Sequence, residues 1–145
     1  MISQQLLGWY SLNKRILPWR ETKDPYKIWI SEIMLQQTQV ATVIPYYEKW
    51  MKSFPNIEAL AQADYNHVLK HWEGLGYYSR CRNIHATAKS LNGKLPETFN
   101  ELIKLPGIGE YTAKTILAIA YNKQEVGVDT NLERVGFRVL GLKKK

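Results

Sequence analysis

Two glycines separated by one residue, in the segment Leu105-Pro-Gly-Ile-Gly109, constrain the fold of this chain more than any other feature of its sequence. Glycine permits positive φ angles and lets the backbone approach a partner closely. The following segment, Glu110–Ala120, has the residue pattern of a helix, and the free N–H groups at a helix start form a site for a phosphate-sized anion. The sequence therefore predicts two helices joined by a tight turn that faces an anion. An ordinary turn between helices is an equally open interpretation of these five residues alone.

Apolar residues recur at helical spacing along nearly the whole chain, without clear strand alternation. Proline or glycine separates most of the periodic segments, as in Phe54-Pro55 and Gly74-Leu-Gly76. The sequence therefore predicts an all-α fold of about nine or ten helices. The expected helices span approximately residues 2–15, 26–37, 40–53, 57–62, 64–72, 77–91, 98–104, 110–121 and 130–141.

The composition restricts the class of protein and its partners. The chain has 145 residues and a formal net charge of +7, and it is rich in tryptophan and tyrosine. A basic, aromatic-rich domain favours a polyanionic partner, with nucleic acid the first candidate. Cys81 is the single cysteine, which excludes an internal disulfide and a cysteine-based metal cluster. We see no signal peptide and no apolar run long enough to cross a membrane, so we expect an intracellular, DNA-associated location in the cytoplasm or nucleoid.

Glu32 and Asp129 are the two carboxylates whose surroundings suggest chemistry. Glu32 lies in an apolar helical segment, and burial there would raise the pKa of its carboxyl group, as a general acid near neutral pH requires. A salt bridge to Lys27 or to a distant arginine is the alternative. Asp129 can cap a helix and, when ionised, can face a developing positive charge, although a cap without chemistry is its alternative. A carboxyl group with a raised pKa beside an ionised carboxylate is similar to the acid and stabiliser pair of glycoside hydrolysis.

Aromatic, amide and basic residues are further candidates for contacts with nucleic acid. Tyr111 follows the glycine turn and either points into the same cleft or packs in the core. Tyr77 and Tyr78 could wedge between bases, although we expect one of the two to pack in the core. The polar run 36–39 is unusual for the middle of a helix and could contact base edges. Candidate phosphate contacts, for each of which a solvated surface charge is the alternative, are Arg15, Arg20, Arg80, Arg82, Lys104 and Lys114.

His67 and His71 lie four residues apart, a spacing that metal-binding pairs use. No glutamate directly follows His67, and no third ligand is evident. The sequence therefore predicts no metal site.

Six sequence blocks, taken in order, resemble one known family. They are Leu17-Pro-Trp-Arg20, Asp24-Pro-Tyr26, Trp29-Ile-Ser-Glu-Ile-Met-Leu-Gln-Gln-Thr-Gln-Val40, Trp72-Glu-Gly-Leu-Gly-Tyr-Tyr-Ser-Arg80, Leu105-Pro-Gly-Ile-Gly109 with Tyr111-Thr-Ala113, and Val128-Asp129 with Asn131. Each block alone is moderately specific, whereas the ordered set is very specific and covers nearly the whole chain. The chain closely resembles the adenine-specific mismatch DNA glycosylases of the MutY family. That family belongs to the helix-hairpin-helix DNA glycosylases, alongside endonuclease III.

The resemblance implies roles for three residues. Glu32 matches the family's catalytic glutamate, which would protonate adenine at N7 and improve the leaving group. Asp129 matches the aspartate that would stabilise the oxocarbenium-like sugar, with or without a covalent bond to it. Tyr111 occupies the position where relatives with lyase activity carry a lysine, which favours a monofunctional glycosylase without a Schiff-base step. Thymine-mismatch relatives usually lack the glutamate, so Glu32 favours adenine as the base removed.

The resemblance also implies which residues contact DNA, from which the target adenine would be flipped into a cleft. Arg20 and Leu35 match residues that line the adenine pocket. Gln37 and one of Tyr77 or Tyr78 match residues inserted near the opposing guanine. The remaining candidate DNA contacts are Arg15, Leu105, Gly107, Gly109 and Thr112.

The implied architecture is a six-helix barrel domain, residues 21–128, with the helix-hairpin-helix at about 98–121. Residues 1–20 and 129–145 would form part of a second helical domain. The family continues with further helices, a four-cysteine loop that binds a [4Fe–4S] cluster, and a C-terminal domain that reads 8-oxoguanine. These 145 residues contain neither the four cysteines nor that domain. We therefore expect no cofactor in this chain, which resembles a catalytic core cut short.

The sequence supports three hypotheses of function. The first is a monomeric glycosylase that removes adenine opposite 8-oxoguanine or guanine in double-stranded DNA. The second, from another class, is a DNA-binding module without catalysis, which would bind DNA in a salt-dependent manner without releasing a base. The third is a glycosylase that acts on another mispaired base.

Overall fold

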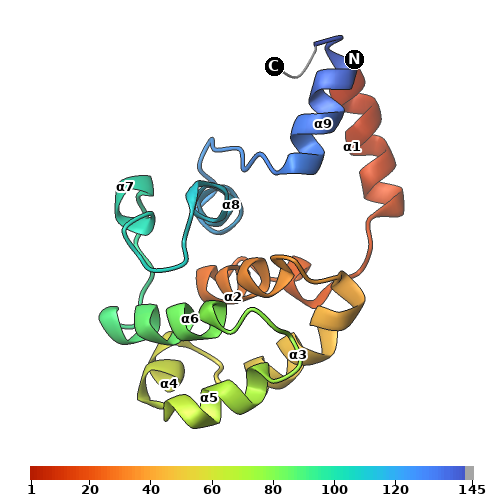
Figure 1. Cartoon of the computed structure of the whole chain (residues 1–145). Helices are drawn as coiled ribbons and strands as arrows, with labels where there is room; N and C mark the ends of the chain where they lie inside the picture. The colour runs from red at the N-terminus through yellow and green to blue at the C-terminus, as the bar shows by residue number, and fades with distance from the viewer. Residues whose placement is uncertain (143–145) are drawn as a thin grey trace.

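The computed structural model describes residues 1–142 and is all-helical (Figure 1), without a strand in that range, as the sequence predicts. The elements are α1 (Ile2–Asn13), η1 (Pro18–Arg20, a 3-10 helix), α2 (Pro25–Leu35), α3 (Val40–Ser53), α4 (Ile57–Gln62), α5 (Tyr65–Trp72), α6 (Ser79–Ser90), α7 (Phe99–Leu102), α8 (Glu110–Ala120) and α9 (Thr130–Val139). Every expected α-helix is present, and each observed end lies close to the expected one. None of these helices has the length and apolar character that a membrane span needs.

Helix α2 lies at the centre of the fold because it is apolar on nearly every side. Trp29 and Met34 are completely buried, and the helix packs against α3, α6 and α8. Asp24 fixes its start, since the carboxylate accepts the backbone N–H of Tyr26 at 2.9 Å. Helix α2 is therefore a rigid support for Glu32, which it carries on the side toward α8.

Buried aromatic residues connect α3 to the central helix. The rings of Trp50 and Phe54 meet edge to face with their centroids 5.0 Å apart. The Tyr26 hydroxyl donates to the carbonyl oxygen of Phe54 at 2.7 Å and accepts the indole N–H of Trp50 at 3.1 Å. The Tyr26 hydroxyl and the Trp50 indole N–H therefore both have hydrogen-bond partners, which avoids the free-energy penalty of burying them unpaired.

The histidine pair is explained by packing between α5 and the end of α3. His71 Nε2 lies 2.8 Å from Ser53 Oγ, and its Nδ1 lies 2.9 Å from the carbonyl oxygen of His67. Both imidazole rings also contact Phe54 edge to face. Within residues 1–142, no three His, Cys, Asp or Glu side chains gather in a way that could bind a metal ion.

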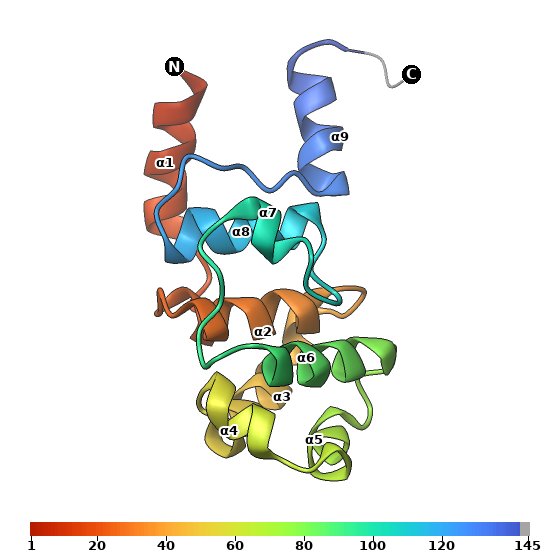
Figure 2. The ribbon, with the colours of Figure 1, turned by 90° about the vertical axis from the view of Figure 1, so that its left-hand side faces the viewer.

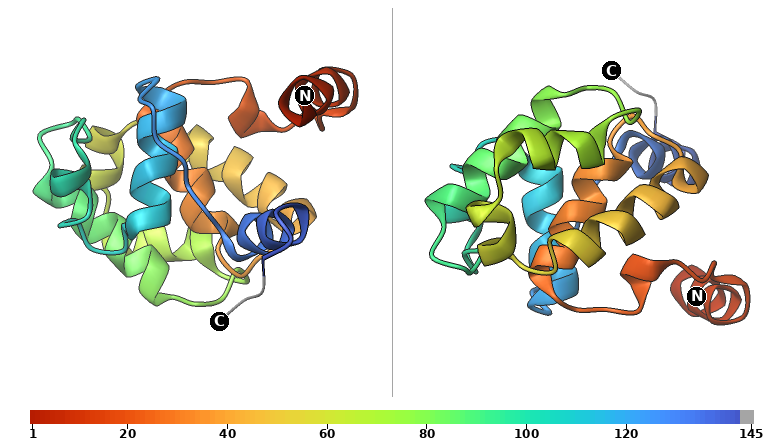
Figure 3. Two further views of the ribbon diagram at one scale, coloured as in Figure 1. Left: turned by 90° about the horizontal axis from the view of Figure 1, so that it is seen from above. Right: turned by 90° about the horizontal axis from the view of Figure 1, so that it is seen from below.

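Helices α1 and α9 project from the same end of the molecule, away from α4 and α5. They overlap in Figure 1 but lie apart in Figure 2 and in both views of Figure 3. Neither helix contains a buried residue, whereas α2–α8 share one hydrophobic core. The division into a domain of residues 21–128 and a second domain of 1–20 with 129–145 stays a prediction, and 143–145 lie outside the described residues.

Candidate active site

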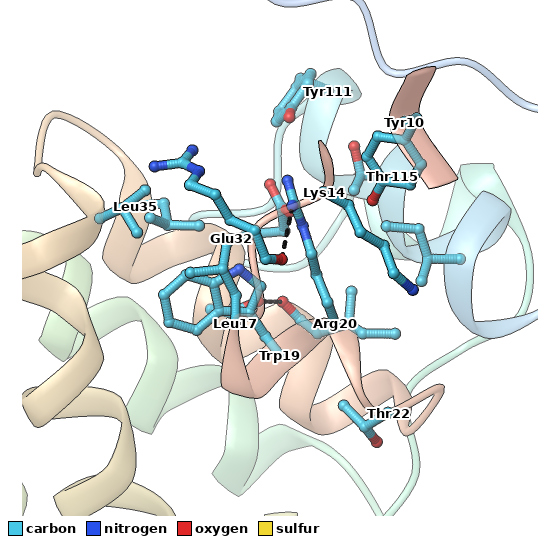
Figure 4. Close-up of a pocket in the computed structure, with 15 residues that line it drawn as sticks. Tyr10, Lys14, Leu17, Trp19, Arg20, Thr22, Glu32, Leu35, Tyr111 and Thr115 are labelled. Atoms are coloured by element: carbon cyan, nitrogen blue, oxygen red, sulfur yellow. Dashed lines mark hydrogen bonds between the residues drawn. The ribbon is translucent and has the colours of Figure 1, made fainter. Parts of the chain in front are cut away.

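A cleft opens between α2 and α8 and has two parts, with volumes of about 540 and 740 Å³. We call it the site cleft, because Arg15, Glu32, Leu35, Val40 and Tyr111 line both parts. Figure 4 shows the smaller part, where side chains from α1, α2 and α8 surround the space. Four of the residues predicted for the site thus lie together. Three more line one part each, namely Arg20 in the smaller part and Gln37 and Asp129 in the larger part.

Glu32 is a half-buried acid within the site cleft. Burial raises the pKa of its carboxyl group from the usual 4.5 to about 7; a hydrogen bond from Tyr111 opposes this rise, and the negative charge of Asp129 adds to it. Among the described residues, no lysine or arginine forms a salt bridge with Glu32, so the salt-bridged alternative is wrong. A large fraction of this carboxyl group therefore carries a proton near neutral pH, as a general acid requires.

Tyr111 lies on α8 and reaches the site cleft from the side opposite Glu32 (Figure 4). Its hydroxyl group interacts with both the Glu32 carboxyl group and the Thr115 hydroxyl group. Burial raises the pKa of the Tyr111 hydroxyl, and the nearby charge of Glu32 raises it further. Tyr111 therefore stays neutral and able to donate to Glu32. Thr115 is not among the residues predicted for the site from the sequence, although its position one turn after Tyr111 places both on one helix face.

Gly127 lets the loop before α9 pass directly over these two side chains. A Cβ at this position would lie 2.4 Å from Thr115 Oγ1 and 3.1 Å from two ring carbons of Tyr111. Such distances require the neighbouring side chains to move. No motif in the sequence marks Gly127, so its role is visible only in the folded chain.

Asp129 caps α9 and faces the larger part of the site cleft. Its carboxylate accepts the backbone N–H of Leu132 at 2.7 Å. The positive end of the helix dipole favours a negative charge at this position. That charge lies near enough to raise the pKa of Glu32. The capping interpretation and the chemical interpretation of Asp129 are therefore compatible.

The glycine motif forms the predicted tight turn before α8. Gly107 has a φ angle of 80°, which favours glycine, and a Cβ there would lie 3.0 Å from the Cβ of Asn83. Ile108 is buried and anchors the turn, whereas Gly109 is exposed and precedes the first residue of α8. The first N–H groups of a helix lack intrahelical partners, so this turn can bind an anion.

Two other residues of this motif differ in their access to solvent. Leu105 is half-buried beside the core. The Thr112 side chain is only 2% exposed, and its hydroxyl oxygen lies 3.5 Å from the amide nitrogen of Gln36. The prediction that Thr112 contacts DNA is therefore wrong for its side chain, and only its backbone N–H at the start of α8 is suited to a phosphate.

The polar run 36–39 and the tyrosine pair both lie in turns rather than in helices. Helix α2 ends at Leu35, so the expectation that this run is in mid-helix is wrong, and Gln37 has a φ angle of 59°. Helix α6 begins only after the tyrosines, and Tyr77 has a φ angle of 47°. Tyr77 is 62% exposed and Tyr78 is 45% exposed, so the expectation that one of the two tyrosines packs in the core is also wrong.

The candidate phosphate contacts divide into different environments. Arg80 is 8% exposed and donates to backbone carbonyls, so the prediction that it contacts phosphate is wrong. Arg20 donates to the carbonyl oxygen of Arg15 at 3.2 Å, and both lie at the site cleft. Lys114 forms a salt bridge with Glu110 at 2.7 Å. Arg82 and Lys104 are exposed.

The chain is all-helical, and its hairpin turn can bind an anion. The site cleft contains the carboxyl group of Glu32, whose pKa is raised by burial, and that of Asp129, which caps α9. Together these features define the class of a helix-hairpin-helix base-excision protein. Residues 30–145 match the family of HhH-GPD superfamily base excision DNA repair proteins. The chain belongs to this family.

Curated relatives and solved structures agree with this assignment. The chain is 51% identical over 140 residues to the adenine DNA glycosylase of Buchnera aphidicola subsp. Baizongia pistaciae, covering 93% of this chain and 40% of the relative. It is 45% identical over 147 residues to the human adenine DNA glycosylase, covering 92% of this chain and 27% of that protein. The chain thus spans less than half the length of these relatives.

Two solved structures have the same fold. A thermostable thymine-DNA glycosylase superposes with a TM-score of 0.84 at 28% identity, covering 91% of this chain and 63% of that one. An endonuclease III in a non-covalent complex with DNA superposes with a TM-score of 0.80 at 22% identity, covering 98% and 69%, respectively.

The described residues do not fit the iron–sulfur cluster that the resemblance implies for the family. Such a cluster needs four cysteine thiolates, whereas Cys81 is a free cysteine on α6 whose side chain is buried in the core. Burial raises the pKa of its thiol to about 12, which disfavours the thiolate that ligates iron.

Proposed function

We propose that this chain carries the catalytic core of a monofunctional adenine DNA glycosylase. Its substrate is adenine mispaired with 8-oxoguanine or guanine in double-stranded DNA, and it acts as a monomer in the compartment that contains the DNA. The observation that carries the proposal is the raised pKa of Glu32, about 7, beside the negative charge of Asp129. The names of the relatives, and Tyr111 in place of a lysine, support adenine and a mechanism without a Schiff base.

The proposed reaction is an N-glycosidic hydrolysis. Glu32 donates its proton to N7 of the flipped adenine, and the bond between C1′ and N9 breaks with its electron pair moving to the base. The carboxylate of Asp129 stabilises the positive charge that develops on the sugar. Water then adds to C1′ and gives up a proton to the ionised Glu32, which restores the starting state. Free adenine and an abasic site are the products.

The shape of the site cleft supports a flipped base as the ligand. Its smaller part, about 540 Å³, is large enough for a purine, and aromatic and apolar side chains line it together with Glu32. Arg15 and Lys14 at the same cleft supply positive charge for the adjoining phosphates. The hairpin turn before α8 supplies backbone N–H groups for a further phosphate.

Alkali treatment tests the proposal. A duplex with one A:8-oxoguanine pair, incubated with stoichiometric protein and then heated in alkali, should be cleaved at the adenine. Parallel duplexes with A:G, T:G and A:T pairs identify the base removed and the opposing base required. Cleavage at another base, or no cleavage at all, would contradict the proposal.

The pH dependence of stability gives an independent test of the environment of Glu32. Its pKa in the folded state, about 7, exceeds the usual value of 4.5 expected for the unfolded chain, so the folded state binds the extra proton and stability falls as pH rises through this window. Glu32→Gln removes this loss. We expect the variant to be about 1–3 kcal/mol more stable than wild type at pH 8.5, after allowance for partial exposure, and equally stable at pH 4.

Urea unfolding at the two pH values measures this difference. Glu48→Gln, at an exposed position on α3, is the matched control and should show no pH-dependent difference from wild type. Equal stability of Glu32→Gln and wild type at pH 8.5 would mean that burial does not raise the pKa of Glu32.

A methyl group at position 127 should disturb the site without touching either carboxylate. We expect Gly127→Ala to lower the rate of adenine release about tenfold or more, because small displacements of positioning groups have effects of this size. The cause is the forced movement of Thr115 and Tyr111, from which a Cβ would be 2.4 and 3.1 Å away. Single-turnover kinetics measure the rate.

Gly136→Ala is the matched control for this change. A Cβ at Gly136, on α9, meets no atom within 4 Å, so its adenine release should equal that of wild type. Equal rates for the two alanine variants would show that the loop at Gly127 does not position Tyr111.

A further inference from the structure

Arg80 is a buried cation without a carboxylate partner among the described residues. It lies in the first turn of α6, and its guanidinium group reaches between the end of α2 and the glycine turn 74–76. A charge in such a place requires compensation by other polar groups. Backbone carbonyl oxygens at the end of α2 supply it, since they carry the partial negative charge of a helix C-terminus.

The guanidinium group connects two separate turns. Nη1 donates to the carbonyl oxygens of Ile33 at 2.8 Å, Met34 at 3.1 Å and Gln36 at 2.5 Å. Nη2 donates to Thr38 Oγ1 and to the carbonyl oxygens of Leu75 and Gly76, each at 3.3 Å. One side chain therefore binds the turn that follows α2 and the turn that precedes α6.

Each of these turns contains a non-glycine residue in the left-handed region. Gln37 has a φ angle of 59° and Tyr77 one of 47°, and such angles persist only where the surroundings fix them. Arg80 donates to the carbonyl group directly before each of them, that of Gln36 and that of Gly76. The Cζ atom of Arg80 also lies 5.4 Å from the ring centroid of Tyr77, within cation–π distance.

Both left-handed residues are exposed, and Gln37 lines the larger part of the site cleft. Tyr78 differs, because its backbone is right-handed with a φ angle of −62°, and the carbonyl group before it accepts only the backbone N–H of Arg80, at 3.0 Å, and no bond from the guanidinium group. The geometry therefore distinguishes Tyr77 from its neighbour.

We propose that Arg80 is a positioning residue that presents Gln37 and Tyr77 together, so that both enter the duplex beside the flipped adenine. This inference rests on the proposed function for its substrate. Arg80 acts on the DNA only through these two side chains.

A double-mutant experiment separates this role from a general contribution to folding. Arg80→Lys keeps the charge, but one ammonium group cannot span both sets of carbonyl oxygens. The change is made in wild type and in a Gln37→Ala/Tyr77→Ala background. The readouts are the fluorescence of 2-aminopurine placed next to the mismatched adenine, which reports base unstacking, and single-turnover adenine release.

We expect Arg80→Lys to lower both readouts about tenfold in wild type and less than twofold in the double-alanine background, because coupled residues are non-additive. Lys89→Met, at an exposed position on α6, should change neither readout. If Arg80→Lys does not fold, Thr38→Val is used instead, because this substitution removes one acceptor of Arg80 Nη2. Thr38→Val should lower both readouts less than Arg80→Lys, and this loss should also vanish in the double-alanine background.

Equal losses in both backgrounds, or unchanged unstacking in Arg80→Lys, would overturn the inference and leave Arg80 with a purely structural role. Unstacking that depends on Arg80 as expected, in a protein that releases no adenine, would support the inference and contradict the proposed function instead.

Discussion

We expect the Glu32→Gln variant to release adenine about 10³-fold more slowly than wild type, within the range that a positioned general acid contributes. The amide keeps the shape of the side chain but has no acidic proton to donate. The carboxyl group that it replaces has a pKa near 7 because it is buried, so at neutral pH wild type has the proton available. Single-turnover release from an A:8-oxoguanine duplex, with protein in excess, measures the effect.

Binding of the same duplex should change little in Glu32→Gln, because the substitution leaves the residues proposed to contact phosphate and the hairpin turn unchanged. A titration with labelled duplex at constant salt concentration tests this, since affinity for DNA depends on salt. Glu48→Gln, exposed on α3, should match wild type in both release and binding. Adenine release by Glu32→Gln at the wild-type rate would remove Glu32 from the reaction.

Asp129→Asn should separate the two roles of Asp129. Asparagine is as good a helix cap as aspartate, so the hydrogen bond to the N–H of Leu132 remains and the free energy of unfolding should change by less than about 0.5 kcal/mol. The negative charge that we propose faces the sugar is lost, however. We expect adenine release to fall about 10²–10³-fold, the size of effect that follows removal of one electrostatic stabiliser.

Two other substitutions complete this comparison. Asp129→Ala removes both roles and should cost about 1 kcal/mol of stability in addition to the loss of activity. Asp64→Asn is the matched control, because Asp64 caps α5 through the N–H of Asn66 at 3.0 Å and lies outside the site cleft. It should change neither property. Normal release by Asp129→Asn would reduce Asp129 to a cap.

The helices and the hairpin could be predicted from the sequence because the signals that define them are local. Periodic apolar residues and the cap at Asp24 fix α2, and the two glycines fix the turn before α8. The environment of Glu32 could also be anticipated, since its helix is apolar on nearly every side. These features depend on residues within one or two turns of each other.

The features that could not be predicted depend on contacts between distant segments. Arg80 has the same local pattern as an exposed arginine, and only the approach of α2 makes it a buried clamp. Thr112 follows the hairpin as a contact residue would, but α8 packs it against Gln36. The exposure of Tyr78 depends on where α6 begins, which helical periodicity does not fix to the residue.

Direct detection of free adenine tests the central proposal without any later chemical step. The protein, in excess over a duplex with one A:8-oxoguanine pair, is incubated at neutral pH, and the released base is separated and quantified. We predict close to one free adenine per duplex, with none from a matched A:T duplex. Binding of the mismatched duplex that weakens with salt, without release of adenine, would contradict the proposal and identify a DNA-binding module that lacks catalysis.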